Sequence, residues 1–159
     1  MTIEGWRGAA PPIPNLVARL SHLPGPVQLL RADRIMGRDH LRSAVEKADR
    51  AFEQGRNVAT TWPLEVLRYA AGERQIGRAL AFLGLAAGPA AVAVVLRGDP
   101  AEWHSLARAL GWERDDAVLD GSDAVLDAWG IAPAARAMLP PDRRADLVLE
   151  RVALSDVAR

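Results

Sequence analysis

Three polar side chains near the middle of the chain, Arg74, Gln75 and Arg78, are of the types that bind nucleic acid. Guanidinium and amide groups donate to phosphate oxygens and base edges, and arginine also stacks on unpaired bases. Arg74 and Arg78 are one helical turn apart, so they share a helix face. Arg56 and Asn57 come earlier and could fold back towards that face. These residues indicate a small RNA site, unless they only cap helix ends and bond carbonyl groups within the fold.

Patterns typical of enzymes are missing from the sequence. No glycine-rich loop ends in Gly-Lys-Ser/Thr, and no serine has a nucleophile-elbow context. The carboxylates Glu113, Asp115 and Asp116 flank a predicted surface loop, where solvated charge is favoured over acid–base work. The three histidines are far apart and there is no cysteine, which excludes thiolate chemistry and disulfides. We therefore expect no catalytic residue, no cofactor and no metal, with an enzyme of unrecognised type as the alternative.

Composition and charge limit the ways in which the chain can bind RNA or a membrane. Lys and Arg total 20 and Asp and Glu total 20, so any RNA binding has to come from a local basic patch. The longest apolar run, residues 86–96, contains Gly88 and Pro89 and is too short to span a bilayer as a helix. The first residues lack the apolar region of a signal peptide. We expect a cytoplasmic protein without a membrane segment, folded as one domain over residues 1–159.

Two predicted helices position the polar cluster. Pro63 suits the first turn of a helix, and Gly72 can take the left-handed conformation that ends it. A second helix begins at Ile76 and ends at Gly84, and its predicted apolar stripe consists of Ile76, Ala79, Leu80 and Leu83. Residues 72–75 therefore form a polar turn between two apolar helices.

The flanking segments predict a mixed fold. An amphipathic helix runs from a cap at Asp39 to Gly55, another helix opens at Asp99, Ser122 caps a short one, and Asp142 caps the last. The valine-rich run 90–96 is typical of a strand covered on both faces, and strands are also predicted at 1–7, 27–35 and 112–119. No βαβ rhythm is present. We predict an α+β fold with a mixed or antiparallel sheet of roughly three to five strands and about five to seven helices.

The central segment resembles a known family. Residues 56–59 (Arg-Asn-Val-Ala), 64–67 (Leu-Glu-Val-Leu) and 72–76 (Gly-Glu-Arg-Gln-Ile), followed by Ala79-Leu80, are similar to the archaeal type of the kinase-binding subunit of KEOPS. KEOPS adds a threonylcarbamoyl group to the adenosine beside the tRNA anticodon. The resemblance extends upstream to residues 28–33 and 39–41, and downstream to the closing helix at 147–154. It covers most of the chain.

The resemblance implies a non-catalytic adaptor. Such a subunit grips the N-terminal lobe of the small atypical KEOPS kinase, and archaeal members bind the single-stranded 3′ CCA end of tRNA. That tail offers unstacked bases and few phosphates, so a small apolar pocket lined by arginine suffices to bind it. The resemblance assigns this pocket, or the turn that shapes it, to Arg56, Asn57, Arg74, Gln75 and Ile76, and we add Arg78 from its shared helix face.

Some features favour an alternative. Many relatives carry a lysine just after the Asn-x-Ala step, where this chain has Thr60 and Thr61, so weaker RNA binding is expected. A protein-interaction module that regulates a kinase without binding RNA is therefore the second hypothesis. Trp62 and Tyr69 could stack on a base, but a core or interface role is more common. We expect the kinase to bind an exposed apolar helix face, and nothing in the sequence forbids a homodimer.

Overall fold

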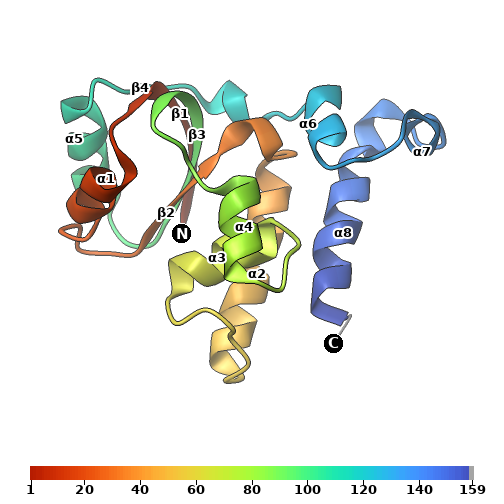
Figure 1. Ribbon diagram of the computed structural model, residues 1–159, viewed down its shortest axis with the longest axis horizontal. Helices are drawn as coiled ribbons and strands as arrows, with labels where there is room; N and C mark the ends of the chain where they lie inside the picture. Colours follow the sequence, from red (N-terminus) through yellow and green to blue (C-terminus); the bar gives the residue numbers. More distant parts are fainter. Residues whose placement is uncertain (158–159) are drawn as a thin grey trace.

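A computed structural model describes residues 1–157, and a four-stranded antiparallel sheet lies at its centre (Figure 1). The strand order is β2-β3-β1-β4, and the strands are β1 (Thr2–Ala10), β2 (Val27–Arg31), β3 (Gly88–Leu96) and β4 (Glu113–Arg114). The α-helices are α1 (Ile13–Leu20), α2 (Arg38–Glu53), α3 (Trp62–Ala70), α4 (Ile76–Leu83), α5 (Ala101–Ala109), α6 (Asp123–Ala128), α7 (Pro133–Ala137) and α8 (Ala145–Val157). Short 3-10 helices occupy Ala32–Arg34, Asp116–Leu119 and Pro141–Arg143. The predicted α+β class is confirmed, with an antiparallel sheet.

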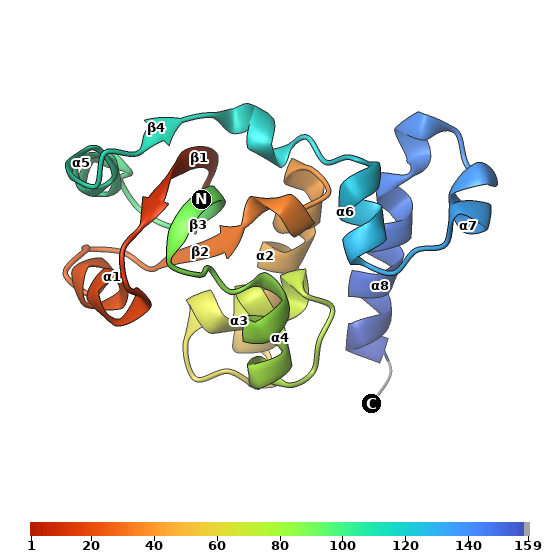
Figure 2. The same cartoon turned by 45° about the horizontal axis from the view of Figure 1, so that its top comes forward.

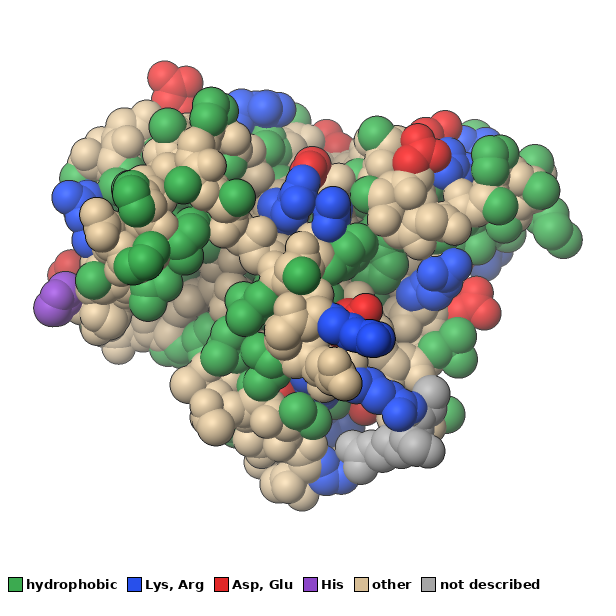
Figure 3. Space-filling view, in the orientation of Figure 1, with side chains coloured by type: hydrophobic (Ala, Val, Ile, Leu, Met, Phe, Trp, Pro, Cys, Tyr) green, Lys and Arg blue, Asp and Glu red, His purple; other side chains and the backbone are tan. Residues whose placement is uncertain are grey.

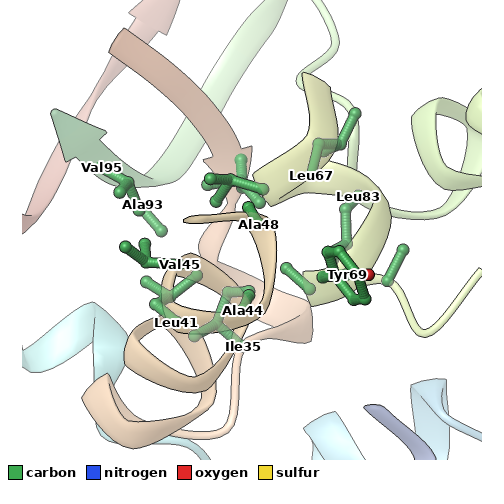
Figure 4. Packing of buried hydrophobic residues seen from close by; sticks show 14 of the residues in the cluster. Ile35, Leu41, Ala44, Val45, Ala48, Leu67, Tyr69, Leu83, Ala93 and Val95 are labelled. Carbon is green, nitrogen blue, oxygen red and sulfur yellow. The ribbon is translucent and has the colours of Figure 1, made fainter. Parts of the chain in front are cut away.

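The sheet is covered on both faces, as the valine-rich run predicts. Helices α1 and α5 lie on one face and α2, α3 and α4 on the other (Figure 2). Alternate side chains of β3 point to opposite faces, so Val94 packs with Trp6 and Trp103 while Ala93 and Val95 pack against α2 and α3. Figure 4 shows the cluster on the α2 face of the sheet, which includes Ala93 and Val95.

Helix α2 follows the prediction except at its start. It ends before Gly55, whose φ of +63° suits the turn that follows. Its first residue is Arg38, preceded by Gly37 with a φ of +93°, so Asp39 lies inside the first turn rather than at the cap. The carboxylate of Asp39 accepts a hydrogen bond from Arg42 at 2.6 Å instead. Glycine's freedom at positive φ lets the helix begin two residues earlier than a cap at Asp39 would place it.

Several predicted strand and helix ends are wrong for local reasons. The strand predicted at 27–35 ends at Arg31 in a 3-10 turn, and the edge strand predicted at 112–119 pairs only over Glu113–Arg114. Beyond it the Asp116 carboxylate, not backbone, accepts the Gly5 N–H at 2.8 Å. Asp142 lies in the 3-10 turn Pro141–Arg143 and does not cap α8. These ends are set by side-chain hydrogen bonds and tight turns, which leave no trace in the hydrophobic periodicity of the sequence.

The C-terminal helices form a small cluster of their own beside α2 (Figure 2). Leu126, Trp129, Val148 and Val152 are at its centre, and the Trp129 indole N–H donates to the Arg34 carbonyl at 2.9 Å. Residues 1–157 contain eight α-helices, more than predicted, because the proline-rich segment holds the short α7. No helix within residues 1–157 is long and apolar enough to cross a membrane.

Candidate nucleic-acid interface

Helix α3 carries a buried ion pair. Glu65 and Arg68 are three residues apart and both are buried, although every other side chain on the buried part of this helix, from Val66 to Ala70, is Ala, Val, Leu or Tyr. Arg68 donates through Nη2 to Glu65 Oε1 at 2.7 Å and through Nε to Oε2 at 3.1 Å. This bidentate geometry offsets part of the cost of removing both charges from water.

The same pair connects two segments at opposite ends of α3. The Glu65 carboxylate accepts the backbone N–H of Ala59 at 2.8 Å and of Val58 at 3.3 Å. Arg68 Nη1 donates to the Glu73 carbonyl at 3.1 Å. The loop at 56–61 and the turn at 72–75 are therefore held against the same two side chains.

The pair stays charged near neutral pH. Burial alone would raise the pKa of Glu65, but hydrogen bonds from Arg68 and from the Ala59 N–H outweigh burial, so the pKa of Glu65 lies below its ordinary value. Burial would lower the pKa of Arg68, and its bonds to Glu65 reverse this, so the pKa of Arg68 is raised. The loop and the turn are thus anchored by a permanent ion pair.

A pocket of about 370 Å³ opens beside this pair. Its lining comes from the loop, from α3, from the turn and from the end of α8, and consists of Arg56, Val58, Arg68, Tyr69, Arg74, Ser155 and Asp156. Basic side chains gather between α4 and α8 on the face shown in Figure 3, with acidic side chains among them. The pocket therefore combines three guanidinium groups with a small apolar surface.

Tyr69 lies at the back of the pocket as part of its wall. Only 2% of the residue is exposed, and the Arg68 guanidinium lies 4.2 Å from its ring centroid. Its hydroxyl donates to Asp156 on α8 at 3.0 Å. Burial and this hydrogen bond to Asp156 raise the pKa of Tyr69. Because Arg68 covers one face of the ring and the residue is almost fully buried, Tyr69 offers no free face for a base, in accord with the core role.

The structure brings two of the six predicted site residues into the pocket, Arg56 and Arg74. Asn57 donates from Nδ2 to the Ala59 carbonyl at 2.9 Å, so its side chain shapes the loop. Gln75 occupies the position before α4 and its side chain is exposed. Ile76 is half-buried at the start of α4. These three residues are close in sequence to lining residues but do not line the pocket themselves.

Arg78 lies outside the pocket lining because the predicted shared face does not form. Helix α4 begins at Ile76, so Arg74 is in the turn and not on the helix. Arg78 is exposed on α4 and separate from the lining residues. The apolar stripe of α4 is also narrower than predicted, since Ala79 and Leu83 are buried while 46% of Leu80 is exposed.

Sequence reasoning missed Glu65, Arg68, Ser155 and Asp156. A signal for the first two was present, because a Glu-x-x-Arg pair in a helix of apolar residues indicates an internal ion pair. Nothing in the sequence marks Asp156, which meets Tyr69 only through the packing of α8 beside α3. Within residues 1–157, no group of three or more His, Asp or Glu side chains is placed to hold a metal ion.

Comparison with known families bears directly on this region. The family model of the kinase binding protein CGI-121 matches residues 15–122, more than half of the chain. The chain belongs to the CGI-121 family. The match includes both anchored segments and α3, and ends before α6. No curated protein matches the chain.

Membership in CGI-121 confirms the coarser part of the resemblance. The family is described as kinase binding proteins, so kinase binding is the functional class that membership gives this chain. Assignment to KEOPS and binding of tRNA remain predictions. The pocket also draws on Ser155 and Asp156, which lie beyond the matched residues.

Proposed function

We propose that this CGI-121 member is a non-catalytic, archaeal-type KEOPS subunit that binds the small atypical kinase of that complex. In this proposal it also captures the single-stranded 3′ CCA end of tRNA and so supports threonylcarbamoylation of tRNA. The observation that carries the RNA part is the pocket in which Arg56 and Arg74 converge beside the buried Glu65–Arg68 pair.

The pocket suits a short single-stranded tail better than a duplex. Its volume of about 370 Å³ lies within the usual range for small-ligand pockets, so it accommodates one or two nucleotides rather than a helix. Arg56 and Arg74 are exposed at its mouth, where a guanidinium can bond a phosphate or stack on a base. Equal numbers of acidic and basic residues give the chain no net positive charge to drive non-specific binding of duplex RNA.

Each predicted residue takes a role that its position allows. Arg56 and Arg74 contact the nucleotides, whereas Asn57, Gln75 and Ile76 set the shape of the loop and the turn. Arg78, exposed on the neighbouring helix, contacts the RNA upstream of the tail.

Titration of tRNA with two arginine variants tests the RNA part. Arg74→Ala is expected to weaken binding by about 1–3 kcal/mol because it removes a contact to a base or phosphate. Arg108→Ala is the matched control, since Arg108 is also exposed but lies on α5 across the sheet. Both variants should keep their binding to the kinase. Equal tRNA affinities for the two variants would show that Arg74 does not contact the RNA.

A second function is favoured by two observations. The Asp156 carboxylate lines the same pocket and opposes a phosphate. Thr60 is exposed at a position where the family resemblance leads us to expect a lysine. These features suit a module that binds the kinase and leaves RNA alone. Kinase binding without any tRNA binding would establish this alternative.

A further inference from the structure

A second hollow lies along the open edge of the sheet, away from the pocket. This groove has a volume of about 930 Å³ and runs between α1 on one face of the sheet and α3 and α4 on the other. Hydrophobic side chains over α1 and over α4 flank the hollow in Figure 3. Its walls include Val17, of which 56% is exposed, and Leu80, of which 46% is exposed. Large apolar side chains exposed together typically mark a binding surface.

The floor of the groove is the free edge of β2. Within residues 1–157, strand β2 pairs only with β3, and the Arg97 N–H donates to the Pro26 carbonyl at 3.1 Å. Hydrogen-bonded pairs alternate in an antiparallel ladder, so Gln28 bonds to β3 and the backbone groups of Val27 and Leu29 point away from it. The outward carbonyl of Leu29 accepts instead from the Gln28 side-chain amide at 2.8 Å.

The residues that line the groove indicate which class of ligand can bind there. Every residue that lines the groove is uncharged, so it offers no group that neutralises a phosphate, and nucleic acid is excluded. A helix satisfies its own backbone and would leave the edge of β2 unpaired. An extended segment supplies N–H and C=O groups to that edge and sends alternate side chains towards the two apolar walls.

We infer that an extended apolar segment of the partner kinase occupies this groove and pairs with β2 as a further strand. The inference rests on the proposed kinase partner and names the surface that meets it. The uncharged lining matches an uncharged segment, and the Gln28 amide covers the Leu29 carbonyl until that strand replaces it. In the free protein, the short length of β2 limits its pairing with other chains.

Binding of the KEOPS kinase from the same organism to full-length variants tests the groove. Val17→Glu and Leu80→Glu each place a charge on one wall, and both sites are exposed enough to preserve the fold. Each should weaken kinase binding by at least about tenfold, as expected for the centre of an interface. Met138→Glu is the control, since Met138 is 84% exposed at the end of α7, outside the groove. Its binding should change less than about twofold. Wild-type affinity in both groove variants would overturn the inference.

Amide hydrogen exchange separates strand addition from other modes of docking. In the kinase complex, the N–H groups of Val27 and Leu29 should exchange at least about tenfold more slowly than in the free protein. Loss of binding in the groove variants without this protection would mean that the groove takes a helix, which contradicts strand addition. A dimer of the free protein that Val17→Glu dissociates would instead show that a second copy fills the groove.

The proposed function can fail separately from the groove. If the wild-type chain does not bind this kinase at all, the proposed partner is wrong and the inferred occupant is wrong with it. If the kinase binds and the groove variants bind equally well, only the docking surface is wrong. Binding of tRNA should be the same in Val17→Glu and Leu80→Glu as in the wild type, because the pocket and the groove share no lining residue.

Discussion

Arg68 and Glu65, paired at 2.7 Å inside α3, hold the loop and the turn whose arginines line the pocket. The exposed residues of the candidate site thus depend on two buried charges that an RNA never touches. This arrangement makes the site rigid, because moving either segment would expose or unpair a buried charge.

Removal of one partner should be costly. Glu65→Ala leaves Arg68 buried and unpaired, and we expect a loss of about 3–5 kcal/mol in the free energy of unfolding, measured in urea. Asp39→Ala serves as the control, because it breaks an exposed i,i+3 pair with Arg42 and should cost less than about 1 kcal/mol. A similar small loss for Glu65→Ala would show that the buried pair does not anchor the fold.

Mild acid should destabilise the protein through His40. Its ring is buried between the Met36 N–H, which donates to Nδ1 at 3.0 Å, and the Ala70 carbonyl, which accepts from Nε2 at 2.7 Å. Burial lowers the pKa of His40 from 6.5 to about 4. Between these values the unfolded chain binds the proton and the folded chain does not. The free energy of unfolding should therefore fall by up to about 3 kcal/mol as pH drops from 6.5 to 4.

The histidine effect is checked by urea unfolding at a series of pH values. His40→Gln should be less stable at neutral pH but should lose most of this pH dependence between 6.5 and 4. His22→Gln changes an exposed histidine and should retain the wild-type profile. An unchanged slope in His40→Gln would assign the acid sensitivity to other groups.

Two glycines near the turn should respond in opposite directions to alanine. Gly72 has a φ of +64° where α3 ends, so Gly72→Ala should cost about 1 kcal/mol or more in unfolding free energy. Gly77 lies inside α4 with open space around its Cα, so Gly77→Ala should stabilise by about 0.5–1 kcal/mol. Thermal unfolding of both variants compares them, and equal shifts would mean that the turn does not require positive φ.

Capture of the tail should show a shallow dependence on salt. If Arg56 and Arg74 each neutralise one phosphate of a single strand, log K against log salt should have a slope of about −1.4. Arg74→Ala should reduce the magnitude of the slope to about 0.7, and Arg108→Ala should leave it unchanged. A much steeper slope would point to a broad basic surface in place of a two-arginine pocket.

Periodic patterns in the sequence predicted the helices and strands well. They did not predict where local contacts end an element early. The apolar repeats of α2 and the valines of β3 are buried as expected, because burial of a regular face leaves a direct mark on the sequence. The end of β4 was not predictable, since it depends on Asp116 bonding to Gly5, a residue far away in the chain. Contacts of that kind have no periodic signature.

The residues of the candidate site also fall into those that the sequence predicts and those that depend on the folded chain. Arg56 and Arg74 were found because their residue types and the family resemblance mark them. Arg78 was wrongly given a helix face shared with Arg74, because Arg74 lies in the turn before α4. The contribution of α8 depends on how the last helix packs beside α3, through Asp156 and Tyr69. Only the folded chain brings those elements together.

Binding of a single tRNA, intact and with its 3′ CCA removed, tests the central claim most directly. The wild-type protein is titrated with both forms under one salt concentration, which matters because affinity for RNA depends on salt. The account predicts that the intact tRNA binds and that the trimmed tRNA loses most of this affinity. Equal binding of the two forms, or binding of neither, would contradict tail capture by this protein.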